Sequence, residues 1–134
     1  MRKTLAAIAI AGALILTGCS SSSEAGGVTN VDVATFATEI TEPGVTIIDV
    51  RTPEEFAAGH VDGAVNINLQ SGTFESDIAQ LDPNAAYAVY CRSGNRSSEA
   101  TAIMGEAGFT DVTNLEAGGF AELAAAGVPA VAGP

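Results

Sequence analysis

The chain has 134 residues, and 16 aspartates and glutamates against five lysines and arginines give it a formal charge of −11. A chain of this length holds one domain. The excess of negative charge excludes a nucleic-acid-binding surface and leaves no basic patch for anionic lipid headgroups.

The N-terminus has the composition of an export signal. Arg2 and Lys3 precede an apolar run over residues 4–16, which is shorter than the roughly 20 apolar residues that a membrane-spanning helix needs. Residues 16–19, Leu-Thr-Gly-Cys, resemble the lipobox of bacterial lipoproteins. That resemblance implies a signal peptide over residues 1–18 and acyl chains, such as palmitate, on Cys19. An ordinary signal peptide with a chance cysteine near its cleavage site is the alternative.

A lipid on Cys19 would place the protein on a bacterial cell membrane, with its domain outside the cytoplasm, in the periplasm or on the cell surface. Residues 19–27 are rich in serine and glycine and are predicted to form a flexible tether. Removal of Arg2 and Lys3 with the signal leaves three arginines against 16 acidic residues, a formal charge of −13. Two of these arginines, Arg92 and Arg96, lie close to one cysteine in the sequence.

The first predicted elements surround an apolar, β-branched run over residues 45–50, which is typical of a strand buried on both faces. A helix is expected before it, over residues 33–41, with Asp32 as the N-cap. Another short helix is expected directly after it. Thr52 and Glu55 can form a capping box there, and Pro53 suits the first helical position.

Further strands are expected over residues 64–67, 86–90 and 112–115, and further helices over residues 73–81, 97–107 and 120–126. Strands that alternate with helices indicate βαβ crossovers. The sequence therefore predicts an α/β domain with a mainly parallel sheet of about five strands flanked by helices. Ligands bind outside the carboxyl ends of the strands in such sheets, and Cys91 directly follows one of these ends.

Cys91 begins a short loop between an expected strand and an expected helix. The N–H groups of such a loop, and the positive end of the helix, point toward the thiol. We therefore expect the pKa of Cys91 to lie below the free-cysteine value of about 8.5. With Arg92 and Arg96 nearby, the loop is predicted to present a nucleophilic sulfur to small anions.

Cysteine usage favours a reactive thiol. The chain has two cysteines, so Cys91 has no disulfide partner if Cys19 carries lipid. A lone thiol in an exported protein indicates reactivity or intermolecular pairing. The alternatives are a buried cysteine that acts as a small hydrophobe and a Cys19–Cys91 disulfide.

Four segments together resemble a single-domain rhodanese, a sulfurtransferase. Residues 48–56 and 59–64 are similar to the two N-terminal signatures of that family, residues 91–97 to its active-site loop and residues 115–120 to its C-terminal Gly-Gly motif. The resemblance extends over residues 28–131 and implies a rhodanese-like, three-layer domain there. Members often have a tryptophan where this chain has Leu123, a difference that concerns the packing of the last helix.

The resemblance implies that Cys91 takes a sulfane sulfur from a small anionic donor such as thiosulfate, becomes a persulfide, and passes the sulfur to cyanide or a thiol. The N–H groups of the loop would cradle the terminal sulfur. Arg92 would meet the sulfonate oxygens of the donor, and Arg96 would close the loop electrostatically. No metal ion or organic cofactor is needed. The implied substrate-binding residues are Arg92, Ser93, Gly94, Asn95, Arg96 and Ser97.

Residues outside the loop are expected to support it. Arg51 is expected to pair with Glu54 or Glu55 at a strand–helix corner. Asp49 is expected either to hydrogen-bond the cysteine loop or to serve the structure alone. His60, the one histidine of the chain, is expected to hold a turn, and a Cys–His pair is the alternative.

Two other classes of protein share this layout. Cdc25-like phosphatases and arsenate reductases resemble rhodaneses in fold, but their signature is one residue longer than the four residues that separate Cys91 from Arg96. The shorter loop suits one sulfur atom better than a tetrahedral phosphate. The other class is a non-catalytic, rhodanese-like binding or sensor module, whose members usually lose the cysteine that this chain keeps.

Overall fold

The computed structural model describes residues 26–134. The predicted signal peptide over residues 1–18, the proposed lipid-bearing Cys19 and residues 20–25 of the predicted tether lie outside the described residues. Gly27, which the sequence assigned to the tether, accepts a hydrogen bond of 2.9 Å from the backbone N–H of Val112. In the described range, no helix has both the length and the apolar character to cross a membrane.

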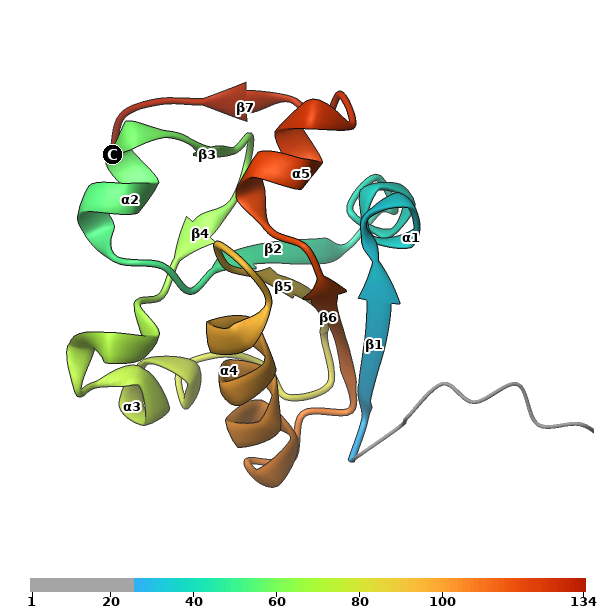
Figure 1. The fold of residues 1–134 in the computed structure, drawn as a ribbon. Helices are drawn as coiled ribbons and strands as arrows, with labels where there is room; N and C mark the ends of the chain where they lie inside the picture. The colour runs from blue at the N-terminus through green and yellow to red at the C-terminus, as the bar shows by residue number, and fades with distance from the viewer. Residues whose placement is uncertain (1–25) are drawn as a thin grey trace, which may run out of the picture.

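Strands alternate with helices along the described chain (Figure 1). The strands are β1 (Val28–Asp32), β2 (Val45–Asp49), β3 (His60–Val61), β4 (Val65–Asn66), β5 (Ala86–Tyr90), β6 (Asp111–Ala117) and β7 (Ala130–Val131). The helices are α1 (Val33–Glu39), α2 (Pro53–Ala58), α3 (Phe74–Ile78), α4 (Asn95–Glu106) and α5 (Phe120–Ala125), with a short 3₁₀ helix η1 (Leu69–Ser71).

The main sheet has five strands in the order β1-β6-β5-β2-β4, and every neighbouring pair is parallel. Helices cover both of its faces, which gives three layers. The predicted fold class is therefore confirmed. All five strands point the same way, so their carboxyl ends, including the end of β5 before Cys91, lie along one edge.

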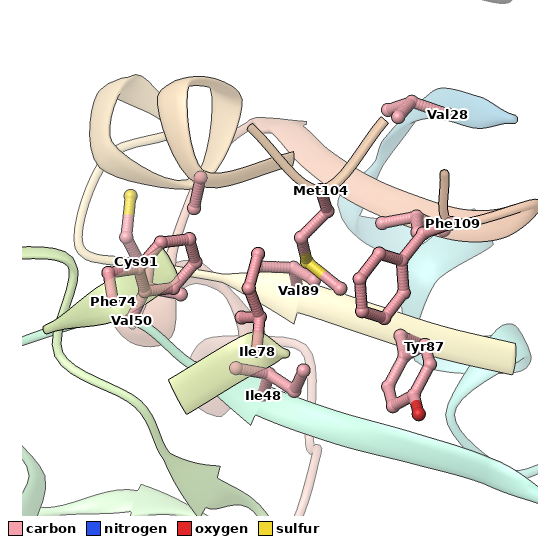
Figure 2. Close-up of a cluster of buried hydrophobic side chains, with 12 residues drawn as sticks. Val28, Ile48, Val50, Phe74, Ile78, Tyr87, Val89, Cys91, Met104 and Phe109 are labelled. Carbon is pink, nitrogen blue, oxygen red and sulfur yellow. The ribbon is translucent and has the colours of Figure 1, made fainter. Parts of the chain in front are cut away.

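Successive residues of β5 serve opposite faces of the sheet. Val89 and Cys91 belong to the core cluster under α3 and α4, where Cys91 lies at one end beside Phe74 (Figure 2). Ala88 and Tyr90 belong to the second cluster, under α1 and α5. Cys91 and Tyr90 are adjacent in sequence, but their side chains therefore lie on different faces.

The capping contacts predicted for the first two helices are confirmed. Asp32 caps α1, with its Oδ1 accepting from the N–H of Thr35 at 2.9 Å. At α2, the capping box between Thr52 and Glu55 is formed, and Pro53 is the first helical residue. These contacts fix α2 at the carboxyl end of β2, next to the site.

Three strands were not predicted. β1 supplies the fifth strand of the sheet by pairing with β6, where the sequence analysis placed the start of the domain but no strand. The strands β3 and β7 form a separate antiparallel pair. Each contains two residues, and their pairing joins distant parts of the chain, which no local pattern reveals.

Candidate active site

The strand β5 and the helix α4 place Cys91 at the carboxyl edge of the sheet. β5 ends at Tyr90 and α4 begins at Asn95, so Cys91 opens a tight loop between them. Gly94 in this loop has a φ of +91°, and a Cβ there would overlap the carbonyl oxygen of Glu116. Only glycine meets both conditions. The loop can therefore lie close against the end of β6.

The Cys91 sulfur is enclosed by the loop. Cys91 is a free thiol that is 1% exposed. The backbone N–H of Gly94 donates to its Sγ at 3.1 Å, and the Ser97 hydroxyl oxygen lies 3.5 Å from the sulfur. In the thiol form, Sγ donates to Ser97, and the hydroxyl can donate in return to a thiolate once it rotates. The Ser97 hydroxyl also lies within donating distance of the carbonyl oxygens of Gly94 and Leu115, which fix the position of its side chain.

The surroundings of Cys91 favour its ionised form. Burial raises the pKa of the thiol, but hydrogen bonds from Ser97 and from the backbone N–H groups of Ser93 and Gly94 outweigh burial and leave the pKa below its ordinary value. Cys91 thus packs as a small hydrophobe does, and it is also prepared to act as a nucleophile.

Arg92 is the exposed cation of the loop. Arg92 lines a cavity of about 310 Å³ between α2 and α5, whose other walls are Arg51, Glu55, Ala58, Gly59, Phe120 and Ala121. Of the three arginines within residues 26–134, Arg92 is the one that forms no ion pair there. Its guanidinium is therefore free to meet an anion from solvent.

Arg96 is engaged by a carboxylate. Its Nη1 and Nη2 donate to Oε2 and Oε1 of Glu55 at 2.7 and 2.8 Å. The Glu55 side chain is 29% exposed and that of Arg96 is 21% exposed. The predicted pairing of Arg51 with Glu54 or Glu55 is wrong, because Arg51 pairs with Asp49 and Glu55 pairs with Arg96 on α4.

Arg51 and Asp49 form a buried ion pair with each other. Arg51 Nη2 lies 2.7 Å from Asp49 Oδ2, and the same guanidinium donates to the carbonyl oxygen of Gly59. Asp49 Oδ2 also accepts from the Tyr90 hydroxyl at 2.6 Å. The expected hydrogen bond from Asp49 to the cysteine loop is absent among the described contacts, so Asp49 serves the structure by holding the residue before Cys91.

His60 has the structural place that the sequence predicted. Its Nδ1 is 2.8 Å from the carbonyl oxygen of Phe56, and its ring stacks on the Phe56 ring with centroids 3.6 Å apart. The ring is buried against α2. No described contact joins it to Cys91, so the geometry gives no Cys–His pair.

The turn at Gly118–Gly119 packs directly behind the loop. The N–H of Phe120 donates to the carbonyl oxygen of Cys91 at 3.0 Å. A Cβ at Gly119 would overlap the carbonyl oxygen of Arg92. The missing side chain therefore allows the turn to approach the cysteine loop closely.

The remaining predicted site residues also lie in or beside this loop. Ser93 and Asn95 are exposed, whereas Gly94 and Ser97 are buried. Sequence reasoning missed two partners. The first is the Glu55–Arg96 pair, which no local pattern reveals. The second is Tyr90, whose opposite direction to Cys91 follows from strand alternation. No cluster of three potential His, Cys, Asp or Glu metal ligands occurs in residues 26–134.

The domain combines a parallel α/β fold with a cysteine in a tight loop at the carboxyl edge of the sheet. Comparison with known proteins identifies the class of domain that has these features. Residues 32–126 match the family described as "Rhodanese-like domain". Thiosulfate sulfurtransferase PspE of Escherichia coli K12 is 42% identical over 77 residues, which are 58% of this chain and 72% of that protein.

Solved structures agree with this match. A rhodanese-like domain of the Alr3790 protein from Anabaena sp. has a TM-score of 0.69 at 26% identity, covering 77% of this chain and 78% of that one. A rhodanese from E. coli, solved with anions, has a TM-score of 0.55 at 39% identity, covering 66% of this chain and 99% of that one. The chain belongs to the rhodanese-like family.

Proposed function

We propose that this protein is a rhodanese-type sulfurtransferase that moves a sulfane sulfur, from a donor such as thiosulfate to a thiophilic acceptor, through a persulfide on Cys91. The observation that carries the proposal is the Cys91 sulfur with the Gly94 N–H at 3.1 Å and the Ser97 hydroxyl at 3.5 Å. The names of relatives such as PspE support the same activity.

The chemistry needs two displacements at sulfur. The Cys91 thiolate attacks the outer sulfur of thiosulfate, a new S–S bond forms, and sulfite leaves with the electron pair of the old bond. An acceptor such as cyanide then attacks the terminal sulfur of the persulfide. Thiocyanate forms, and the electron pair of the S–S bond returns to Cys91 as a thiolate. Electrons balance in each step without a metal or an organic cofactor.

The loop stabilises the sulfur at each stage. The backbone N–H groups of Ser93 and Gly94 and the Ser97 hydroxyl favour a charged sulfur over a neutral one. Such preorganised donors stabilise charge that develops during a reaction. Arg92, free and exposed at the mouth of the loop, is the cation that we assign to the sulfonate oxygens of the donor.

The direction of Arg96 argues against a phosphatase. A phosphate-binding loop needs its arginine aimed at the phosphate, but the Arg96 guanidinium gives two hydrogen bonds to Glu55. This arrangement leaves the backbone donors and Arg92 for the substrate, which favours a small sulfur cargo.

Turnover distinguishes the three candidate classes. We expect thiocyanate to accumulate when the protein is mixed with thiosulfate and cyanide, and a Cys91→Ser variant to give none. Hydrolysis of an aryl phosphate without thiocyanate formation would favour a phosphatase. A protein that does neither, with every sulfane donor tried, would be a binding or sensor module.

We further propose that Cys19 carries lipid and that the domain works outside the cytoplasm on a bacterial cell membrane. The lipobox-like residues 16–19 support this proposal, and two acyl chains would hold the protein on the membrane durably. A fatty-acid probe should label the wild-type protein and not a Cys19→Ala variant. Equal labelling of both proteins, or of neither, would contradict the anchor.

A further inference from the structure

Glu55 joins two elements that the site depends on. Its Oε2 accepts from the backbone N–H of Thr52 at 3.0 Å, which completes the capping box of α2. The same Oε2 and the neighbouring Oε1 accept from the two terminal nitrogens of Arg96, in the first turn of α4. One carboxylate therefore fixes the start of α2 and the exit of the cysteine loop together.

The ion pair between Glu55 and Arg96 keeps both side chains ionised. Paired hydrogen bonds between a guanidinium and a carboxylate are stronger than single ones and fix the orientation of both planes. The hydrogen bonds from Arg96 are the main cause that lowers the pKa of Glu55 to about 2. Glu55 therefore carries a full negative charge at neutral pH, directly against the Arg96 cation.

Arg96 lies in the first turn of α4, directly before Ser97, whose hydroxyl contacts the Cys91 sulfur. The pKa of Arg96 is raised, first by its hydrogen bonds to Glu55 and further by the negative charges of Glu55, Cys91 and Asp49. The interaction between Arg96 and the Cys91 thiolate is reciprocal. A group that offsets the charge of Arg96 therefore also changes how strongly the thiolate is stabilised.

We propose that Glu55 is a positioning residue that holds Arg96 beside the cysteine loop and offsets its charge. The Cys91 thiolate is then stabilised by N–H and O–H donors, and Arg92 alone presents an uncompensated cation to the donor. This inference depends on the proposed function in one respect, which is that Cys91 is the reacting thiol. A thiolate that is stabilised too strongly is a weaker nucleophile, so the offset keeps the sulfur reactive.

Other ionisable groups around Cys91 remain the same in every variant of the test. Asp49 is already neutralised by Arg51. Apart from Glu55 and Arg96, the ionisable side chains on the elements around the loop are Tyr87 and Tyr90 on β5, Asp49 and Arg51 at the end of β2, Asp111 and Glu116 on β6, Glu54 on α2, Glu75 and Asp77 on α3, Glu99 and Glu106 on α4, Glu122 on α5 and Arg92 in the loop.

The test is a double-mutant cycle read by NMR. The full chain is labelled with cysteine carrying ¹³C at Cβ, the Cys91 signal is assigned with Cys91→Ser, and its shift is followed against pH. Glu55→Gln, which keeps a capping-box residue at that position, should lower the titration midpoint by about one unit, because Arg96 is then uncompensated. Glu55→Gln/Arg96→Gln should titrate near the wild-type midpoint. An unchanged midpoint in Glu55→Gln, or an equal shift in both variants, overturns the proposal.

A second comparison does not need Glu55→Gln to fold. Arg96→Gln and Glu55→Gln/Arg96→Gln both lack the arginine, so their difference reports the charge of Glu55 alone. The Cys91 midpoint should be higher by about one unit where Glu55 remains, and equal midpoints overturn the proposal. The titration needs no turnover. If the midpoints shift as expected but no sulfur is transferred, the proposed function alone is rejected. If sulfur is transferred but the midpoints of the variants do not differ, the role of Glu55 alone is rejected.

Discussion

At the scale of single residues, the side chain of Ser97 is the part of the cradle that mutation can remove most cleanly. Its hydroxyl lies 3.5 Å from the Cys91 sulfur and is held by two backbone carbonyl oxygens. Ser93 contributes through its backbone N–H, and its side chain is exposed. The two serines of the loop therefore have different roles, and they make a matched pair for experiment.

Ser97→Ala should move the acid limb of the kcat/KM profile for thiosulfate to higher pH by about one unit. The thiolate is the reacting form, and the hydrogen bond lowers the pKa of Cys91, so its loss raises the pH at which the thiolate forms. Stopped-flow or steady-state rates across pH 5–9 would measure the limb. Ser93→Ala should leave it in place, and an equal movement in both variants would contradict this account.

Arg92→Ala should raise the KM for thiosulfate about tenfold, with kcat within about twofold of wild type, because one charge-assisted contact of roughly 1.4 kcal/mol is lost. Steady-state kinetics with cyanide at saturation would measure both constants. Arg92→Lys keeps the positive charge but lacks the paired N–H donors of a guanidinium. Its KM should therefore lie between those of the wild type and Arg92→Ala. An unchanged KM in Arg92→Ala would remove Arg92 from the donor site.

The sequence predicted the site at Cys91 because the loop is local. Cys91, Gly94 and Ser97 are close in the chain, and the strand and helix on either side fix their geometry. The partners of the other charged groups depend on how distant elements pack. Arg51 was expected to pair with Glu54 or Glu55, but Arg51 pairs with Asp49. Glu55 pairs with Arg96, which is 41 residues further along the chain.

At the scale of elements, the turn between β6 and α5 supports the cysteine loop from behind. Gly119 lies against the carbonyl oxygens of Arg92 and Cys91, and the N–H of Phe120 binds the latter. Gly119 has extended backbone angles that any residue can adopt. Space, and not conformation, therefore requires glycine at this position.

Gly119→Ala should destabilise the protein by about 2–3 kcal/mol, because the added Cβ meets backbone atoms that cannot move without displacing the loop. Sulfur uptake by Cys91 should slow in the same variant. Gly44→Ala is the control, since Gly44 has a φ of +86° but nothing within 4 Å of the added carbon, and should cost only about 1 kcal/mol. Urea unfolding would give both values, and equal losses would show that close packing is unimportant at Gly119.

Elements with a clear local pattern were predictable, whatever their length: β4 has two residues and lies within the strand expected over residues 64–67. The sequence placed the strand at Ala86–Tyr90 with the bounds that the structure has, because apolar residues and flanking turns mark it. Both strands of the β3–β7 pair contain two residues, so tertiary contact and not sequence pattern decides their pairing. β1 was missed because it ends at Asp32, the residue whose side chain caps α1, so the local pattern there indicates the start of a helix.

At the scale of the whole molecule, the net negative charge of the chain opposes the approach of the anionic donor to the site. The chain has a formal charge of −11, while Arg92, in the cysteine loop, is the one described arginine that forms no ion pair among residues 26–134. The repulsion between the acidic surface and an anionic donor decays over the Debye length, which is about 30 Å at 0.01 M salt and about 8 Å at 0.15 M. The short-range attraction of Arg92 is screened much less.

We therefore expect kcat/KM for thiosulfate to rise severalfold as potassium chloride is raised from about 0.01 to 0.15 M, because salt screens the repulsion before it screens the contact. Initial rates at low thiosulfate and saturating cyanide would measure it. A fall over the same range would mean that local attraction, and not the acidic surface, governs the approach of the donor.

The persulfide on Cys91 is the central claim, and the mass of the protein tests it most directly. After incubation with thiosulfate and removal of excess reagent, the intact protein should gain the mass of one sulfur atom, located by peptide mapping on the segment that contains Cys91. Cyanide should remove the added mass, and Cys91→Ser should never acquire it. A wild-type protein that keeps its original mass with every sulfane donor, or gains sulfur equally in Cys91→Ser, would contradict the account.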